Sequence, residues 1–151
     1  MNLFDGLLLF EIVLLALGIL LFCLLVWMLV YGTLPKGGIG LFLVSVLMIG
    51  YPGVQKWSFM NGLIAVDNYT KTVATATGSE RAEASKNLKL RLSAIDPDRV
   101  QAPETFSIIA QAQEAIGERE KALKNVDKAL ALQPGLSKAI ALKRKLQEAP
   151  L

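Results

Sequence analysis

Apolar side chains dominate the first part of the chain, in two runs that a short charged turn separates. From Ile12 to Tyr31 there are 20 residues without a charge, and between Lys36 and Lys56 there are 19 more. A helix rises about 1.5 Å per residue and a bilayer core is about 30 Å thick, so each run is long enough to cross a membrane. The pattern therefore predicts two transmembrane helices, the second of them nearly upright in the bilayer.

The two predicted spans form a hairpin, because only a short turn joins them. We place the hairpin within residues 1–56, with helices at about 7–31 and 38–55. Pro52 lies near the far membrane interface, where we expect it to kink or end the second helix. The following residues, 57–78, are predicted to be either a linker or a membrane-proximal helix.

Charged residues are concentrated in the rest of the chain. Of its 16 Lys and Arg and its 13 Asp and Glu residues, only Asp5, Glu11 and Lys36 precede Lys56. A segment of such charge density cannot lie in hydrocarbon, so a polar module follows the membrane anchor. Lys56 and Lys71 flank the membrane on the side of the termini, against Lys36 alone in the turn, which favours cytoplasmic termini. We expect an integral protein of a bacterial inner membrane with a cytoplasmic tail.

The polar half shows the spacing of two amphipathic helices. The first stripe, at i, i+3, i+4 and i+7, consists of Phe106, Ile109, Ala110 and Gln113. The second stripe consists of Ala122, Leu123, Val126, Ala129 and Leu130. Gly117 lies between the two stripes and Pro134 follows the second, so the predicted helices are short and closely linked. A short link makes them antiparallel neighbours.

This stretch resembles a tetratricopeptide repeat (TPR), a helix-turn-helix unit of about 34 residues. The resemblance covers residues 103–148, with the best repeat at 103–136 and a cap helix at 137–148. The residues that carry it form the predicted repeat core: Phe106, Ile109, Ala110, Gly117, Ala122, Val126, Ala129 and Pro134. Gln113 departs from the family pattern, because it stands where the family has an aromatic side chain. This replacement is expected to thin the contact between the paired helices.

A poorer unit precedes this repeat. Residues 79–95 are predicted to form a helix of the same kind, so that the whole module spans 79–150, whereas the Thr-rich segment 67–78 favours no strong helix. One good repeat, one poor one and a cap are too few for independent stability, since about three repeats are usually needed. We therefore expect the module to complete its core against a second copy, a partner protein or the membrane-proximal segment.

The resemblance also implies a binding surface, because the first helix of each TPR unit lines a concave face that binds peptides or helices. Carried over to this chain, the partner-binding groove consists of Glu104, Ser107, Gln111, Glu114, Lys138 and Lys145. Some family members clamp a terminal carboxylate with Lys and Asn on this face. Ser107 and Gln111 stand at those positions here, so that clamp is not expected. The simpler interpretation is that the six residues are solvated helix positions.

The residue types most used in catalysis are scarce. The chain has no His and a single Cys, Cys23, which lies in an apolar run. The commonest general base and metal ligand are therefore lacking, and we expect no enzyme activity, metal, cofactor or small-molecule substrate. The basic run Lys143, Arg144 and Lys145 points around its helix, which disfavours nucleic-acid binding. Glu11 is the possible intramembrane polar site; we expect an interfacial, solvated carboxylate, with an ion or proton site as the alternative.

These patterns predict an all-α protein, a two-helix transmembrane hairpin followed by a small TPR-like helical-repeat module. The leading hypothesis is a membrane-anchored adaptor or scaffold that docks or stabilises partner proteins, or further copies of itself. The alternative is an integral accessory subunit of a membrane enzyme or transporter, held mainly by its transmembrane helices. A factor for cytochrome c maturation, which is similar in organisation, is a specific version of that alternative. A channel or proton-conducting element built around Glu11 is the third hypothesis.

Overall fold

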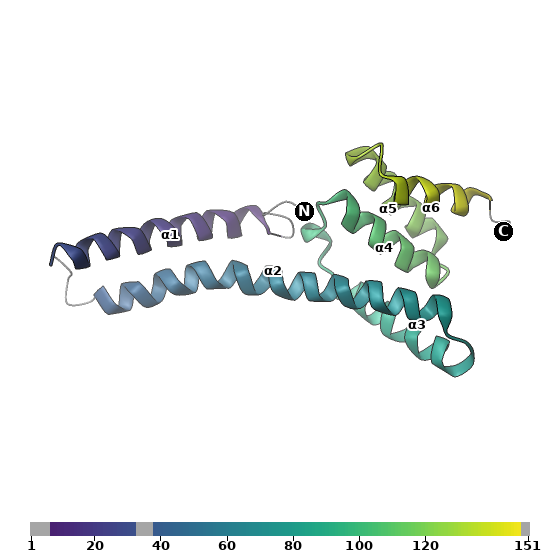
Figure 1. Ribbon diagram of the computed structural model, residues 1–151, viewed down its shortest axis with the longest axis horizontal. Helices are drawn as coiled ribbons and strands as arrows, with labels where there is room; N and C mark the ends of the chain where they lie inside the picture. Colours follow the sequence, from purple (N-terminus) through teal and green to yellow (C-terminus); the bar gives the residue numbers. More distant parts are fainter. Residues whose placement is uncertain (1–6, 33–37, 149–151) are drawn as a thin grey trace. The chain divides into compact units, whose positions relative to one another are not determined.

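A computed structural model describes residues 7–32 and 38–148. Their regular secondary structure is entirely helical, which confirms the predicted all-α class (Figure 1). The helices are α1 (Leu9–Val30), α2 (Gly38–Thr75), α3 (Gly78–Ser93), α4 (Pro103–Ala115), α5 (Arg119–Leu132) and α6 (Ser137–Glu148), with a short 3-10 turn, η1 (Pro97–Arg99), before α4. The predicted turn at Lys36 and the last predicted module residues lie outside the described residues.

The chain divides into two compact units, Met1–Ser58 and Phe59–Leu151, and the division falls inside α2. In the first unit, α1 and α2 are both long and apolar enough to cross a membrane. The two helices pack closely at Gly18, because a Cβ atom built there would lie only 2.9 Å from the Cβ of Met48. The rings of Phe22 and Phe42 meet edge to face, with centroids 5.7 Å apart. A small residue thus allows close helix contact, as is common between membrane helices.

Pro52 does not end the second helix, and this part of the prediction was wrong. It lies inside α2, which continues to Thr75. Proline removes one backbone hydrogen bond and costs a helix about 3 kcal/mol. The turns beyond it restore one hydrogen bond per residue, and they carry Val66 and Val73, whose side chains are almost fully buried in the second unit. The packing of these later turns outweighs a single local defect.

The Thr-rich segment is also helical, contrary to the expectation from propensity. The hydroxyls of Thr70, Thr72 and Thr75 each donate a hydrogen bond to the carbonyl oxygen four residues earlier, at 2.7–3.1 Å. Threonine disfavours helices partly because its hydroxyl competes for backbone groups. Here the hydroxyls donate to carbonyl oxygens of the same helix, so they do not interrupt it. Residues 59–75 are therefore the continuation of α2 rather than a linker.

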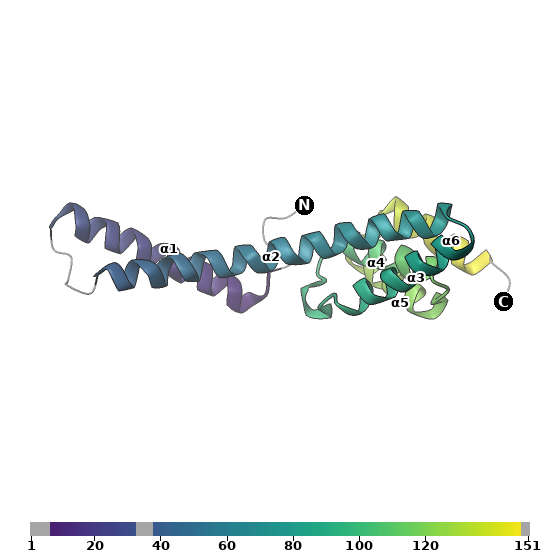
Figure 2. The same cartoon turned by 90° about the horizontal axis from the view of Figure 1, so that it is seen from below.

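Three apolar clusters hold the second unit together, and residues 59–75 contribute to two of them, the first core and a smaller cluster of Leu63, Val100 and Ile109. The first core joins α2, α3 and α4 and consists of Val66, Val73, Ala84, Leu88 and Ala112. The second core joins α4, α5 and α6 and consists of Ala110, Ala122, Val126, Ala129, Ala139, Leu142 and Leu146. Figure 2 shows the end of α2 lying along α3, as the first core requires. Of the three candidates expected to complete the module, residues 59–75 of the same chain bury apolar side chains in its core.

Glycine sets the sharp reversal between α4 and α5. Gly117 has a φ of +81°, a conformation that a side chain disfavours. Its N–H donates to the carbonyl of Glu114 at 3.0 Å, and the N–H of Glu118 donates to the carbonyl of Gln113 at 2.8 Å. This paired arrangement satisfies carbonyl groups at the end of α4. It also brings α5 back against α4 within a few residues.

The burial of Leu88 in the first core leads to a testable prediction about the stability of the module. Leu88→Ala removes a fully buried side chain and is expected to lower the free energy of unfolding of the module by about 2–5 kcal/mol. Leu90→Ala is the matched control, because Leu90 lies on the same helix with 66% of its surface exposed and is expected to change stability by less than about 0.5 kcal/mol. Urea unfolding of the full chain in detergent, followed by circular dichroism, measures both. Equal effects at the two positions would contradict the assignment of the first core.

Candidate functional site

The residues predicted to line a groove differ in how exposed they are in the structure. Glu104 and Lys138 are exposed and Gln111 is partly exposed. Ser107, in contrast, is only 2% exposed, and within the described residues its hydroxyl has no hydrogen-bond partner. The expectation that Ser107 lies on an open binding face is therefore wrong. Its side chain is short, and the fold encloses it.

Glu114 and Lys145 are brought together, but they bind each other. Their charged groups lie 2.8 Å apart and link α4 to α6. A second ion pair, between Lys143 and Asp127 at 2.8 Å, links α6 to α5. The guanidinium of Arg119 also donates to a backbone carbonyl near the end of α6. These contacts fasten α6 at its edges, while its apolar face lies in the second core.

Glu11 lies in the first turn of α1, where its carboxylate has a local structural role. Its Oε2 accepts a hydrogen bond from the backbone N–H of Leu8 at 3.0 Å. The first N–H groups of a helix lack carbonyl acceptors, so a carboxylate three residues on can satisfy one of them. The side chain is buried, which corrects the expectation of a solvated carboxylate.

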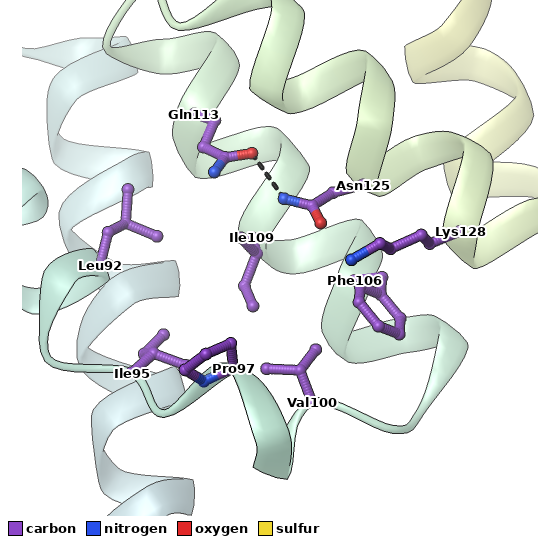
Figure 3. Close-up of a pocket in the computed structure, with 9 residues that line it drawn as sticks. All are labelled: Leu92, Ile95, Pro97, Val100, Phe106, Ile109, Gln113, Asn125 and Lys128. Atoms are coloured by element: carbon purple, nitrogen blue, oxygen red, sulfur yellow. Dashed lines mark hydrogen bonds between the residues drawn. The ribbon is translucent and has the colours of Figure 1, made fainter.

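A pocket opens in the second unit between the end of α3, the η1 turn, α4 and α5 (Figure 3). Its volume is about 190 Å³. The lining residues are Leu92, Ile95, Pro97, Val100, Phe106, Ile109, Gln113, Asn125 and Lys128. Most of this wall is apolar, and the polar groups come from α4 and α5.

The polar part of the pocket is built on a hydrogen bond between two amides. The Oε1 atom of Gln113 accepts from the Nδ2 atom of Asn125 at 2.8 Å, joining α4 to α5. Next to this pair, the ammonium group of Lys128 lies 5.4 Å from the centre of the Phe106 ring. Two slender amides thus join the helices at the position where the family resemblance would place a bulky aromatic. Open space remains beside them.

The sequence contained a signal for one residue in the polar part of this site. Gln113 stands where the family resemblance would place an aromatic side chain. Asn125 carried no such signal, because it lies farther from the reversal at Gly117 and Glu118 than Gln113 does and spacing alone does not pair the two. The wall formed by the end of α3 and η1 had no such signal, because its position depends on how a connecting segment packs.

The chemistry of the pocket suits binding. Lys128 is its one titratable lining residue, so no pair of groups is placed to transfer a proton or attack a substrate. Within the described residues, no group of three or more Cys, Asp or Glu side chains is placed to hold a metal ion. Comparisons of the chain with protein-family models, with curated proteins and with solved structures find no match.

The ion pair between α4 and α6 can be tested by charge exchange. Lys145→Glu and Glu114→Lys each place like charges together and are expected to lower the free energy of unfolding by about 1 kcal/mol. The double exchange restores an attractive pair and is expected to recover most of that loss. Lys138→Glu, an exposed change on the same helix, is the control and should have little effect. The measurement is urea unfolding; additive losses in the double variant would contradict the pairing.

Proposed function

We propose that this chain is a membrane-anchored adaptor whose TPR-like helical module docks partner proteins of a membrane complex. The pocket beside Gln113 and Asn125 is the observation that carries the proposal. Its volume of about 190 Å³ is below the range of about 300–1,000 Å³ that is usual for small-molecule sites. A space of that size suits a single protruding side chain of another protein, which is how anchoring residues bind at interfaces.

The order of the helices supports the TPR-like part of the proposal. Residues 59–75 of α2 pair with α3, α4 pairs with α5, and α6 packs on the last pair. Glycines with positive φ stand at both reversals, Gly78 at +60° and Gly117 at +81°. Two helical pairs and a terminal helix form a short array of the kind that presents a surface to partners.

The apolar surface of the first unit supports the membrane anchor. Trp27, Leu47 and Val54 each expose more than 60% of their surface on helices that are long enough to span a bilayer. Lipid is the solvent that such a surface prefers, and in helices all backbone hydrogen bonds are satisfied internally. The proposal places the anchor in a bacterial inner membrane, and the distribution of lysines favours the cytoplasmic side for the module.

The test is to extract the tagged full-length protein in a mild detergent, measure the intact mass of what emerges, and identify every co-purifying chain. We expect a stoichiometric complex with at least one other protein. Lys128→Glu at the pocket should lower the yield of that partner by about fivefold, the equivalent of about 1 kcal/mol. Lys124→Glu is the matched control, because Lys124 is exposed on the same helix and does not line the pocket.

Two other outcomes would contradict the proposal. A homo-oligomer without other chains would favour self-assembly instead. A complex that both variants retain in full, with crosslinks confined to α1 and the first part of α2, would favour an accessory subunit held by its membrane helices.

A further inference from the structure

The pocket combines an apolar wall with a polar end. Leu92, Ile95 and Val100 line the side toward α3 and η1, and Ile109 lines the pocket from α4 (Figure 3). At the other end are the amides of Gln113 and Asn125. An occupant that fits this division has an apolar body and a polar tip.

The hydrogen bonding of the amide pair defines which groups the polar tip of an occupant must carry. The bond between Gln113 Oε1 and Asn125 Nδ2 leaves the amide nitrogen of Gln113 and the Oδ1 atom of Asn125 without hydrogen-bond partners among the described residues. The pocket therefore offers a donor group, the amide NH2 of Gln113, and an acceptor, the Oδ1 atom of Asn125. A purely apolar occupant would displace water from both groups and form no hydrogen bond to either of them, which is unfavourable. A hydroxyl group can donate and accept at once.

The volume limits the apolar body to about one ring. A protein cavity of about 150 Å³ lined by aliphatic and aromatic side chains admits benzene, and this pocket measures about 190 Å³. A phenol ring therefore fits with little space left. Among protein side chains, tyrosine has both the ring and the hydroxyl.

The charge at the edge of the pocket indicates which residues would flank a tyrosine side chain bound there. Lys143 and Lys145 are each paired with a carboxylate at 2.8 Å. Lys128, in contrast, has no ion pair among the described residues, and its ammonium group lies over the Phe106 ring. Asp96, which adjoins the pocket residue Pro97, lies 3.5 Å from Arg99. The edge at Lys128 thus favours an acidic neighbour in the partner.

We propose that the pocket is the anchor site for a tyrosine side chain in an acidic segment of a partner protein. The inference rests on the proposed adaptor function and names the chemistry of its partner. The ring lies among Leu92, Ile95 and Ile109, the hydroxyl bonds to the amides of Gln113 and Asn125, and a flanking carboxylate meets Lys128. The partner is an acidic, tyrosine-bearing protein segment rather than a nucleotide, a metal or a lipid.

The test uses the full-length chain in lipid nanodiscs with isotope-labelled isoleucine methyl groups, observed by NMR. The probe is a capped Glu-Tyr-Glu tripeptide. Ile95 and Ile109 line the pocket, and their signals are expected to shift in a saturable way. Ile64 and Ile140 are exposed elsewhere in the second unit and serve as internal controls, whose signals should stay in place.

Matched peptides and variants separate the parts of the proposal. Capped Glu-Leu-Glu and Lys-Tyr-Lys are each expected to bind about fivefold more weakly than Glu-Tyr-Glu, because leucine has neither the ring nor the hydroxyl of tyrosine and the lysines repel Lys128. Lys128→Glu should reverse the preference for acidic over basic flanks. Gln113→Tyr fills the pocket from within and should abolish the shifts at Ile95 and Ile109 while the control signals keep their positions.

The proposal is overturned if no signal moves selectively, if the leucine peptide binds as well as the tyrosine peptide, or if Lys128→Glu leaves the charge preference unchanged. These failures are distinct from failure of the adaptor function. A partner complex that co-purifies with wild type and with Gln113→Tyr alike would keep the adaptor and remove this anchor. Selective peptide binding by a chain that purifies alone would keep the chemistry of the pocket and remove the adaptor.

Discussion

The helical module depends on the burial of Val66 and Val73 against α3 and α4. Neither α3 nor the pair formed by α4 and α5 can cover its own apolar face, because a helical pair leaves one side open. The last turns of α2 cover that side and form the first core with Leu88 and Ala112. Once α3 is held there, its end and the η1 turn form one wall of the pocket. The pocket is thus a consequence of how the core is completed.

The same packing explains why local rules failed within α2. Pro52 and the threonines of segment 67–78 each argue against a continuous helix when the chain is read a few residues at a time. The buried valines lie beyond Pro52, just before and within the Thr-rich segment, and their contribution appears only when α3 and α4 are present. Propensity is a weak preference of tenths of a kcal/mol per residue, apart from proline, whereas burying one valine contributes about 1.5 kcal/mol or more. Tertiary contacts therefore determine that this region is helical.

Much of the fold could be predicted because the strongest signals were periodic or long. The two apolar runs and the stripes around Gly117 indicated helices from local sequence alone, although α2 extends to Thr75, well beyond the end that the second run predicts. The candidate site was harder to predict, because a groove copied from a family position by position ignores which side chains the fold encloses. Ser107 became buried, and Glu114 and Lys145 paired with each other. Lys128 carried no sequence signal, since its role depends on Phe106 lying beneath it across the helix pair.

Gln113 and Asn125 show how stability is distributed in the second unit. An aromatic side chain at position 113 would fill the pocket and contribute about 1.5–3 kcal/mol by burial, more than the net 0.5–1.5 kcal/mol of a typical hydrogen bond. The chain lacks that burial at position 113. The neighbouring helix α6 is held instead by its ion pairs and by the second core. Polar residues at a position that favours an apolar one are commonly found where a protein binds something. The local loss of burial at Gln113 therefore supports the proposal that a side chain of a partner fills the space beside it.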